Sequence, residues 1–324
     1  MEMWRPGGQE LAVGRRKAVL LLEELVADFP DVPQYLQQLA SAYTELGCSL
    51  HDTGRLEEAE THHRQSLAIL EELYADFADV PKDLEVLANS HHWLGATLFR
   101  RGLLAEAEEH LRESLSLREQ WSAEHPASAK RRAALAHIKA YVGWLLARQG
   151  KAEEAEQQYR EAIAIREKLV EEFPAHVDHR RRLGHNLRSL YGLLSNSGRV
   201  QEAEDMLREA VFHWEKLAGD HPDVSHFREF LGDSFATLGN MLSETGRLEE
   251  SDRAYRKALT LREKMLSDFP EVPEYRDELA ETYGNLGDLL EKMGRLEEAQ
   301  EARKKAQEIE SEEVTPERTE DRIE

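Results

Sequence analysis

The segment Gly54-Arg55-Leu56-Glu57-Glu58-Ala59-Glu60 returns along the chain as Gly246-Arg247-Leu248-Glu249-Glu250-Ser251-Asp252 and as Gly294-Arg295-Leu296-Glu297-Glu298-Ala299-Gln300. Related segments begin at three further glycines, so the leading glycines fall 48 residues apart, at 54, 102, 150, 198, 246 and 294. A fixed period of this length is the signature of a repeat protein whose units bury their apolar faces against their neighbours. The repeat therefore predicts one elongated array of similar units in place of separate globular domains.

Within one unit the apolar residues follow a helical period. Between Pro273 and Met293 they recur at steps of three and four, which places them on one face of a helix. Gly294 then supplies the left-handed cap that ends this helix. We expect helix A of the first full unit over about 33–53 and helix B over about 55–76, with the same spans repeated in each later unit.

These patterns predict an all-α fold, a right-handed α-solenoid of helix-turn-helix units with unusually long helices. Residues 1–32 would form an N-terminal partial repeat (helix B only), and residues 33–312 six 48-residue repeats. Residues 313–324 are acidic, and we expect a disordered tail there. The partial repeat leaves one helix face open, which either an upstream domain or a second copy of the chain would cover.

A column of glycines predicts how the two helices of each unit pack. A glycine at this position lets helix B lie close to helix A, and the column comprises Gly47, Gly95, Gly143, Gly239 and Gly287. An alanine column that begins at Ala59 does the same from the other side. Repeat 4 departs from this pattern, because Tyr191 stands where glycine is expected and Gly192 follows it. A groove-facing Gly192 would leave bare backbone for the close approach of a ligand.

The composition excludes several classes of protein. The 324 residues include 64 acidic and 42 basic side chains, and the net charge of −22 argues against broad contact with nucleic-acid phosphates or anionic lipid. A single cysteine rules out a disulfide scaffold and fits a reducing compartment. No apolar run approaches the length of a membrane span. We therefore expect a cytoplasmic protein that binds neither nucleic acid nor membrane.

No pattern in the sequence indicates catalysis or metal binding. The 14 histidines lack the spacing of convergent metal ligands. The recurrent glutamate pairs, such as Glu57-Glu58, belong to the first turn of each helix B, so they are structural and not acid/base pairs. A phosphate-binding loop, a nucleophile elbow and an HExxH motif are all missing. We therefore predict a protein with no enzymatic activity, no cofactor and no metal.

The columns resemble the tetratricopeptide repeat, whose pattern is aromatic-x2-Leu-Gly-x2-Tyr followed by Ala-x3-aromatic. The first full repeat contains Tyr43-x2-Leu46-Gly47-x2-Leu50 and Ala59-x3-His63, and the fifth contains Phe235-x2-Leu238-Gly239-x2-Leu242 and Ser251-x3-Tyr255. The resemblance extends from about residue 10 to 312, although the common unit is about 34 residues long. Long-helix repeats of this kind are similar to arrays in bacterial multidomain proteins.

The resemblance implies a binding scaffold in which helix A lines a concave groove for an extended peptide or a partner helix. Counted back from each turn glycine, the groove positions of the family are aromatic and basic in repeats 2–4, although the chain is acidic. These positions are Asn89, His92, Trp93, Phe99 and Arg100 in repeat 2, His137, Tyr141, Trp144 and Arg148 in repeat 3, and Arg181, His185, Arg188 and Asn196 in repeat 4.

The groove set supports more than one interpretation. In the first, its arginines bind an acidic or phosphorylated protein segment and its aromatic rings hold the apolar side chains of that segment. In the second, the arginines pair with neighbouring carboxylates and the aromatic rings pack between the long helices. Two rival functions also stay open: a regulatory sensor that binds a small ligand in the same groove, and a structural solenoid that self-assembles through its open N-terminal end.

Overall fold

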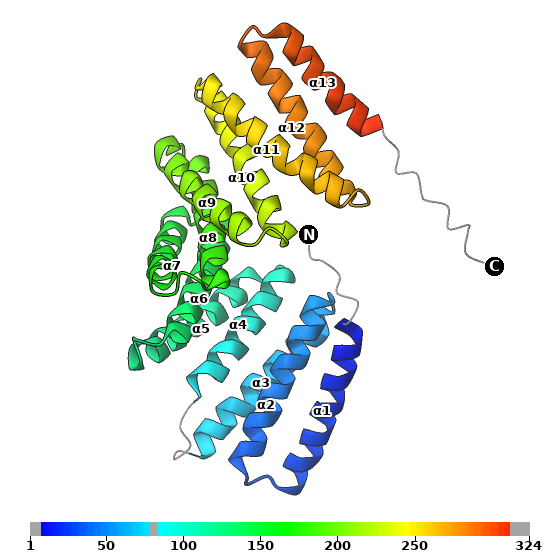
Figure 1. Ribbon diagram of the computed structural model, residues 1–324. Coiled ribbons are helices and arrows are strands. Elements are labelled where there is room, and N and C mark those ends of the chain that lie inside the picture. Colours follow the sequence, from blue (N-terminus) through cyan, green and yellow to red (C-terminus); the bar gives the residue numbers. More distant parts are fainter. Residues whose placement is uncertain (1–7, 78–82, 312–324) are drawn as a thin grey trace, which may run out of the picture. The chain divides into compact units, whose positions relative to one another are not determined.

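The computed structural model describes residues 8–77 and 83–311, and α-helices joined by short turns make up these ranges (Figure 1). The helices are α1 (Gly8–Asp28), α2 (Pro33–Asp52), α3 (Leu56–Asp76), α4 (Leu84–Arg100), α5 (Leu104–Glu124), α6 (Ala129–Arg148), α7 (Ala152–Glu172), α8 (Val177–Asn196), α9 (Val200–Asp220), α10 (Ser225–Glu244), α11 (Leu248–Asp268), α12 (Pro273–Lys292) and α13 (Leu296–Ser311). The predicted pairs of helices are confirmed. Among the described residues, no helix has the length and apolarity needed to cross a membrane.

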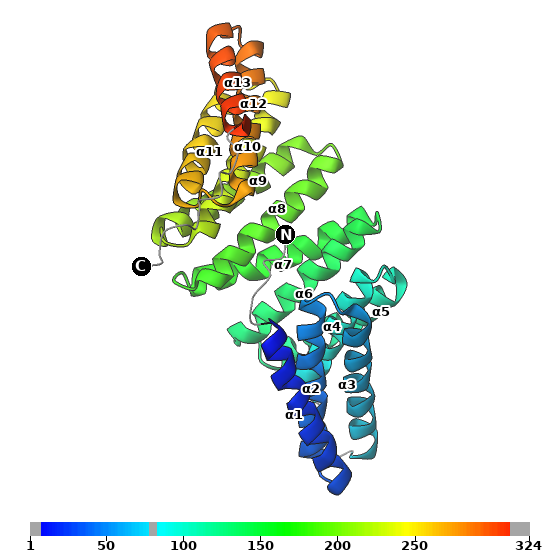
Figure 2. The ribbon, with the colours of Figure 1, turned by 90° about the vertical axis from the view of Figure 1, so that its right-hand side faces the viewer.

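The chain divides into two compact units, residues 1–169 and 170–324, and α7 runs across the division. In the first unit, each helix from α1 to α6 packs against the next one in the chain. In the second unit the same order holds from α8 to α13, and Figure 2 shows successive helices lying side by side within each unit. The partition of the sequence at residues 32 and 312 stays a prediction, and the expected tail lies outside the described residues.

Each helix A ends in the same glycine turn. The φ angles of the six turn glycines lie between 72° and 79°, in the left-handed region that glycine adopts without steric cost. In the first turn the N–H of Arg55 donates to the carbonyl of Leu50 at 2.8 Å, and the N–H of Gly54 donates to that of His51 at 3.0 Å. This pair of bonds is the Schellman arrangement, and it recurs at the other five turns. The predicted glycine caps are therefore confirmed.

The small-residue column sets how closely the two helices of a repeat approach. A Cβ atom added to Gly239 of α10 would lie 2.7 Å from the ring of Tyr255 on α11, and one added to Gly95 would lie 2.7 Å from Leu111. Repeat 4 makes this contact two turns earlier, because the ring of Trp214 packs on Gly184. A Cβ atom on Gly192 would meet nothing within 4 Å, so that glycine packs against no neighbouring helix.

Ion pairs link the B helices of successive repeats. Arg64 of α3 lies 2.8 Å from Glu106 of α5, and Arg208 of α9 lies 3.1 Å from Glu250 of α11. The same step recurs at three further pairs: Arg16 with Glu58, Arg112 with Glu154, and Arg256 with Glu298. Exposed pairs of this kind stabilise a protein by at most about 1 kcal/mol each. The acidic first turn of helix B therefore has an ionic partner in the preceding repeat, which sequence analysis did not predict.

The contact at Gly239 predicts that alanine substitution at two glycines changes the free energy of unfolding in opposite directions. We expect Gly239→Ala to lower the free energy of unfolding by about 1–3 kcal/mol, because its Cβ atom would overlap the Tyr255 ring. Gly284→Ala in the interior of α12 has open space, and we expect it to raise the same quantity by up to about 1 kcal/mol through helix propensity. Urea unfolding followed by circular dichroism measures both, and equal effects would contradict this account of the column.

Candidate functional site

The predicted groove residues of repeats 2 and 3 gather into one cluster of rings in the first unit. Phe99 of α4 and Trp144 of α6 lie 4.2 Å apart between ring centroids, and Tyr141 lies 5.5 Å from Trp144. His92 joins them at 5.0 Å from Tyr141. We call the whole set the aromatic cluster, and it comprises His51, His92, Trp93, Phe99, His137, Tyr141 and Trp144. Rings from three A helices, α2, α4 and α6, are therefore in continuous contact.

The aromatic cluster is uncharged inside and basic at one border. Burial, with His137 and Arg118 nearby, holds the pKa of His92 well below its usual value, and burial raises the pKa of Tyr141 to about 12. Both side chains are therefore neutral at neutral pH. Trp144 is 38% exposed, so part of its side chain is accessible to a ligand. Arg100 and Arg148 lie in the last turns of α4 and α6, and both are exposed.

The contacts of Arg100 tie it to the helix pair before it. Its Nη1 donates to the carbonyl oxygen of His51, on α2, at 2.6 Å. That oxygen lies at the end of α2, where the last carbonyls of a helix attract cations. Arg100 thus has a structural contact with the helix pair before it.

Two arginines that sequence analysis missed reach the groove positions from helix B. Arg118 of α5 is 6% exposed, and its Nη2 donates to Oδ1 of Asn89 at 2.7 Å. Arg262 of α11 makes the equivalent contact, since its Nη2 donates to Oδ1 of Asp233 at 2.9 Å. Burial lowers the pKa of Arg118 to about 10, so this side chain stays cationic at neutral pH. Asn89 is therefore held in place by a contact within the first unit.

The groove residues of repeat 4 lie in the second unit, where the two arginines have acidic neighbours. Arg181 donates from Nη2 to Oδ1 of Asp178 at 2.5 Å, and Nη1 of Arg188 lies 3.5 Å from Oδ2 of Asp233. These pairs agree with the interpretation in which arginines pair with neighbouring carboxylates. Asn196 is exposed at the C-terminal end of α8.

His185 of α8 is enclosed by aromatic side chains. Its ring centroid lies 4.9 Å from that of Trp214 and 4.5 Å from that of Phe230. Burial, with Arg181 and Arg188 close by, lowers the pKa of His185 to about 4. The imidazole is therefore neutral at neutral pH. Within the described ranges, no group of three or more histidine, cysteine, aspartate or glutamate side chains is arranged to hold a metal ion.

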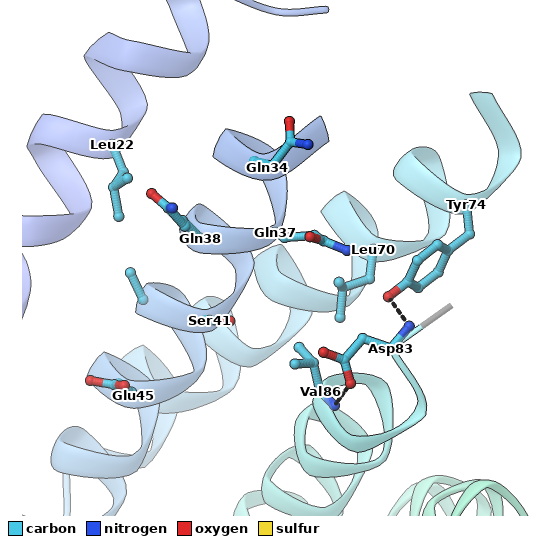
Figure 3. Close-up of a pocket in the computed structure, with 11 residues that line it drawn as sticks. Leu22, Gln34, Gln37, Gln38, Ser41, Glu45, Leu70, Tyr74, Asp83 and Val86 are labelled. Atoms are coloured by element: carbon cyan, nitrogen blue, oxygen red, sulfur yellow. Dashed lines mark hydrogen bonds between the residues drawn. The ribbon is translucent and has the colours of Figure 1, made fainter. Parts of the chain in front are cut away.

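A hollow in the first unit is lined by residues outside the predicted set. This α2 cavity has a volume of about 430 Å³ and lies between α1, α2, α3 and the start of α4 (Figure 3). Asp83 lies at one side of the cavity and is held by two hydrogen bonds. Its Oδ1 accepts the N–H of Val86 at 3.2 Å, and its own N–H donates to the Tyr74 hydroxyl at 2.8 Å. Its lining residues are Leu22, Gln34, Gln37, Gln38, Ser41, Ala42, Glu45, Leu70, Tyr74, Asp83 and Val86.

Comparison with known families identifies the repeat. Family models described as tetratricopeptide repeat match residues 39–79, 86–168, 231–271 and 280–313, which together make up more than half of the chain. A comparison with curated proteins returns no match.

Solved structures of similar fold cover most of the chain. The apo form of RapI is 14% identical, with 93% of this chain and 92% of that chain covered and a TM-score of 0.53. BtubC (BKLC) from P. vanneervenii is 16% identical over 99% of each chain, with a TM-score of 0.42. A putative kinesin light chain with nearly identical TPR-like repeats, from Podosopora anserina, is 20% identical over 70% of this chain and 96% of that one, with a TM-score of 0.49. At these identities the likeness to RapI shows a shared fold.

A buried histidine close to the aromatic cluster predicts a dependence of stability on pH. His63 is fully buried against Gly47, neither ring nitrogen has a hydrogen-bond partner among the described residues, and burial lowers its pKa to about 3. The unfolded chain binds this proton with an ordinary pKa of about 6.5, so acid favours unfolding below that pH and has no effect through His63 above it. At pH 5 the loss is about 2 kcal/mol.

We expect His63→Leu to reduce this acid destabilisation, because leucine does not titrate and Leu111 holds the equivalent position in the next repeat. Urea unfolding of both proteins at pH 7.5 and pH 5 measures the difference. An equal loss of stability in the wild type and the variant would show that His63 does not cause it.

Proposed function

Because the chain belongs to the tetratricopeptide repeat family, we propose that it is a non-catalytic scaffold that binds a protein partner. The proposal assigns the main contact to the aromatic cluster of the first unit. One observation carries it: Trp144 is 38% exposed, packs on Phe99 at 4.2 Å, and stands one helical turn before Arg148. An exposed ring on a packed aromatic base beside a cation suits a ligand that has both an apolar and an acidic group.

The chemistry of the aromatic cluster favours an acidic or phosphorylated segment as the ligand. Tryptophan and tyrosine supply large contact areas at low cost in side-chain entropy, and they are common anchors at protein interfaces. The planar guanidinium groups of Arg100 and Arg148 fit carboxylate or phosphate oxygens in two-pronged bonds. Arg148 is exposed in the last turn of α6, so its positive charge would orient an acidic segment.

On the second unit, the proposal assigns Arg181, His185, Arg188 and Asn196 of α8 to a separate contact with the same kind of ligand. The ligand would have to compete with Asp178 and Asp233 for the two arginines. A phosphate group is suited to that competition, because it carries more charge and more acceptor oxygens than one carboxylate.

Affinity capture with matched variants tests the role of the aromatic cluster. We expect Trp144→Ala and Arg148→Glu to lower recovery of the partner by about tenfold or more, as loss of an interface anchor does. Phe212→Ala removes an exposed ring on α9 of the second unit and is the control, so its recovery should match the wild type. Quantitative mass spectrometry of the captured proteins gives the readout. Equal recovery with all variants would contradict the proposal and favour the small-ligand sensor.

A second candidate function, self-association through α1, rests on a different observation. Ala18 of α1 is exposed. The residues at its position in later repeats are all 0% exposed, and they are Ser66, Ser114, Ala162, Ala210 and Ala258. Leu21 of the same helix is 58% exposed, whereas Leu117 and His213 at its position in later repeats are buried. The face of α1 that corresponds to a buried face elsewhere is therefore open, and a second copy of the chain would cover it.

Light scattering over a concentration series measures this association. We expect the wild type to form dimers and Leu21→Glu to remain monomeric, because a charge in the centre of the face would be buried without a partner. Phe212→Glu places the same charge on another exposed apolar residue and should leave the dimer intact. A wild-type chain that stays monomeric at every concentration would refute self-association and leave the scaffold proposal unaffected.

A further inference from the structure

One column of helix B changes its side chain along the array, and the α2 cavity lies where that column is short. At intervals of 48 residues the column contains Leu22, Leu70, Arg118, Arg166, Trp214 and Arg262. Leu22 and Leu70 both line the α2 cavity, and Leu70 is itself fully buried, as are the longer side chains of Arg166 and Trp214. Long side chains thus fill the later positions of the column, and the two leucines at its start leave space unfilled.

The two arginines with described contacts show what this position binds. Arg262 donates to Oδ1 of Asp233 on its own helix A at 2.9 Å and to the carbonyl oxygen of Glu278 on the next helix A at 2.8 Å. Arg118 donates to Oδ1 of Asn89 at 2.7 Å and approaches the carbonyl of Ala134 at 3.4 Å. In both places a guanidinium group lies between two A helices and bonds to oxygens of both, and Arg262 also donates to the Thr282 hydroxyl.

The equivalent oxygens are present around Leu70. Ser41 takes the position of Asn89 and Asp233, and Val86 takes the position of Ala134 and Glu278. The Ser90 hydroxyl donates to the carbonyl of Val86 at 3.1 Å, as the Thr282 hydroxyl donates to that of Glu278 at 2.8 Å. The acceptor framework of the later repeats is therefore retained, although the side chain at this position is a leucine.

The lining of the α2 cavity is rich in oxygen acceptors and contains no cation. Glu45 and Asp83 contribute carboxylates, and Gln34, Gln37 and Gln38 contribute amide oxygens (Figure 3). Outside the lining, Arg15 lies 3.6 Å from one carboxylate oxygen of Glu45. Leu22, Ala42, Leu70 and Val86 form the apolar part of the wall, which suits the methylene stem of a long basic side chain.

We propose that the α2 cavity binds the guanidinium group of an arginine from a partner peptide, in the place that Arg118 and Arg262 fill in their own repeats. The stem would lie against the apolar wall at Leu22, and the charged group would reach Ser41, the carbonyl of Val86 and the carboxylate of Asp83 (Figure 3). This site is separate from the aromatic cluster. The inference goes beyond the proposed function, because it would hold even if the aromatic cluster bound nothing.

A pair of matched peptides tests the proposal on the full chain. The probe is a fluorescein-labelled hexapeptide of glycine and serine with one central arginine, and the control peptide has the neutral isostere citrulline at that position. Fluorescence polarisation should show the arginine peptide binding at least about tenfold more tightly, because a charge-assisted bond is lost in the control. Equal binding of the two peptides, or no binding of either up to millimolar concentrations, would overturn the proposal.

Two variants check that binding occurs in the α2 cavity. Leu70→Arg supplies the side chain that later repeats have, so we expect it to occupy the cavity from within and weaken arginine-peptide binding at least tenfold. Leu70→Met keeps the volume of the wild-type side chain and should bind as the wild type does. Ser41→Arg blocks the cavity from the surface without replacing a fully buried residue, so it decides the result if Leu70→Arg fails to fold by circular dichroism. Unchanged binding in a folded arginine variant would overturn the proposal.

Discussion

The close contact of helix A with helix B in each repeat is the constraint on which the rest of the structure depends. A glycine turn with two backbone hydrogen bonds fixes the angle at which helix B leaves helix A. A glycine in the body of helix A, such as Gly239, lets the facing ring approach so closely that a methyl group would not fit. Because both features recur every 48 residues, equivalent side chains occupy equivalent places. Differences between repeats are therefore differences of side chain on a nearly constant backbone.

Acidic side chains at the start of B helices form ion pairs with arginines of the neighbouring repeat. Pairs such as Arg64 with Glu106 place cations of one B helix on the acidic first turn of the next, and each pair contributes little alone. Their effect on function is indirect, because they occupy one exposed arginine on each of several B helices. A cation at the end of a helix A, such as Arg148, does not belong to these ion pairs between B helices. The basic border of the aromatic cluster is thus formed by arginines of the A helices, outside the row of ion pairs between B helices.

The sequence predicted the fold well because its signals are local. Glycine spacing, helical periodicity and the small-residue column each depend on a few neighbouring positions, and the glycine turns and helix pairs agree with them. Most members of the aromatic cluster were also foreseeable, since they occupy groove positions of neighbouring A helices, but His51 was not in the predicted set. The neighbours of Arg188 were not foreseeable, because Asp233 lies one repeat away and only the packing of two helices brings it close. The pairing of Arg181 with Asp178 was predictable, because the two residues lie three positions apart on one helix.

The column from Leu22 to Arg262 explains how a uniform scaffold acquires distinct sites. One backbone position holds a leucine, an arginine or a tryptophan, and each choice has a different consequence for the groove beside it. Arginine links two A helices and fixes a groove residue such as Asn89, tryptophan packs against His185, and leucine leaves a polar hollow. In repeat 4 the tryptophan itself makes the close contact with helix A, because Trp214 packs on Gly184, so the two helices stay in contact there as well. Specificity can therefore vary along the array without loss of the packing that holds the array together.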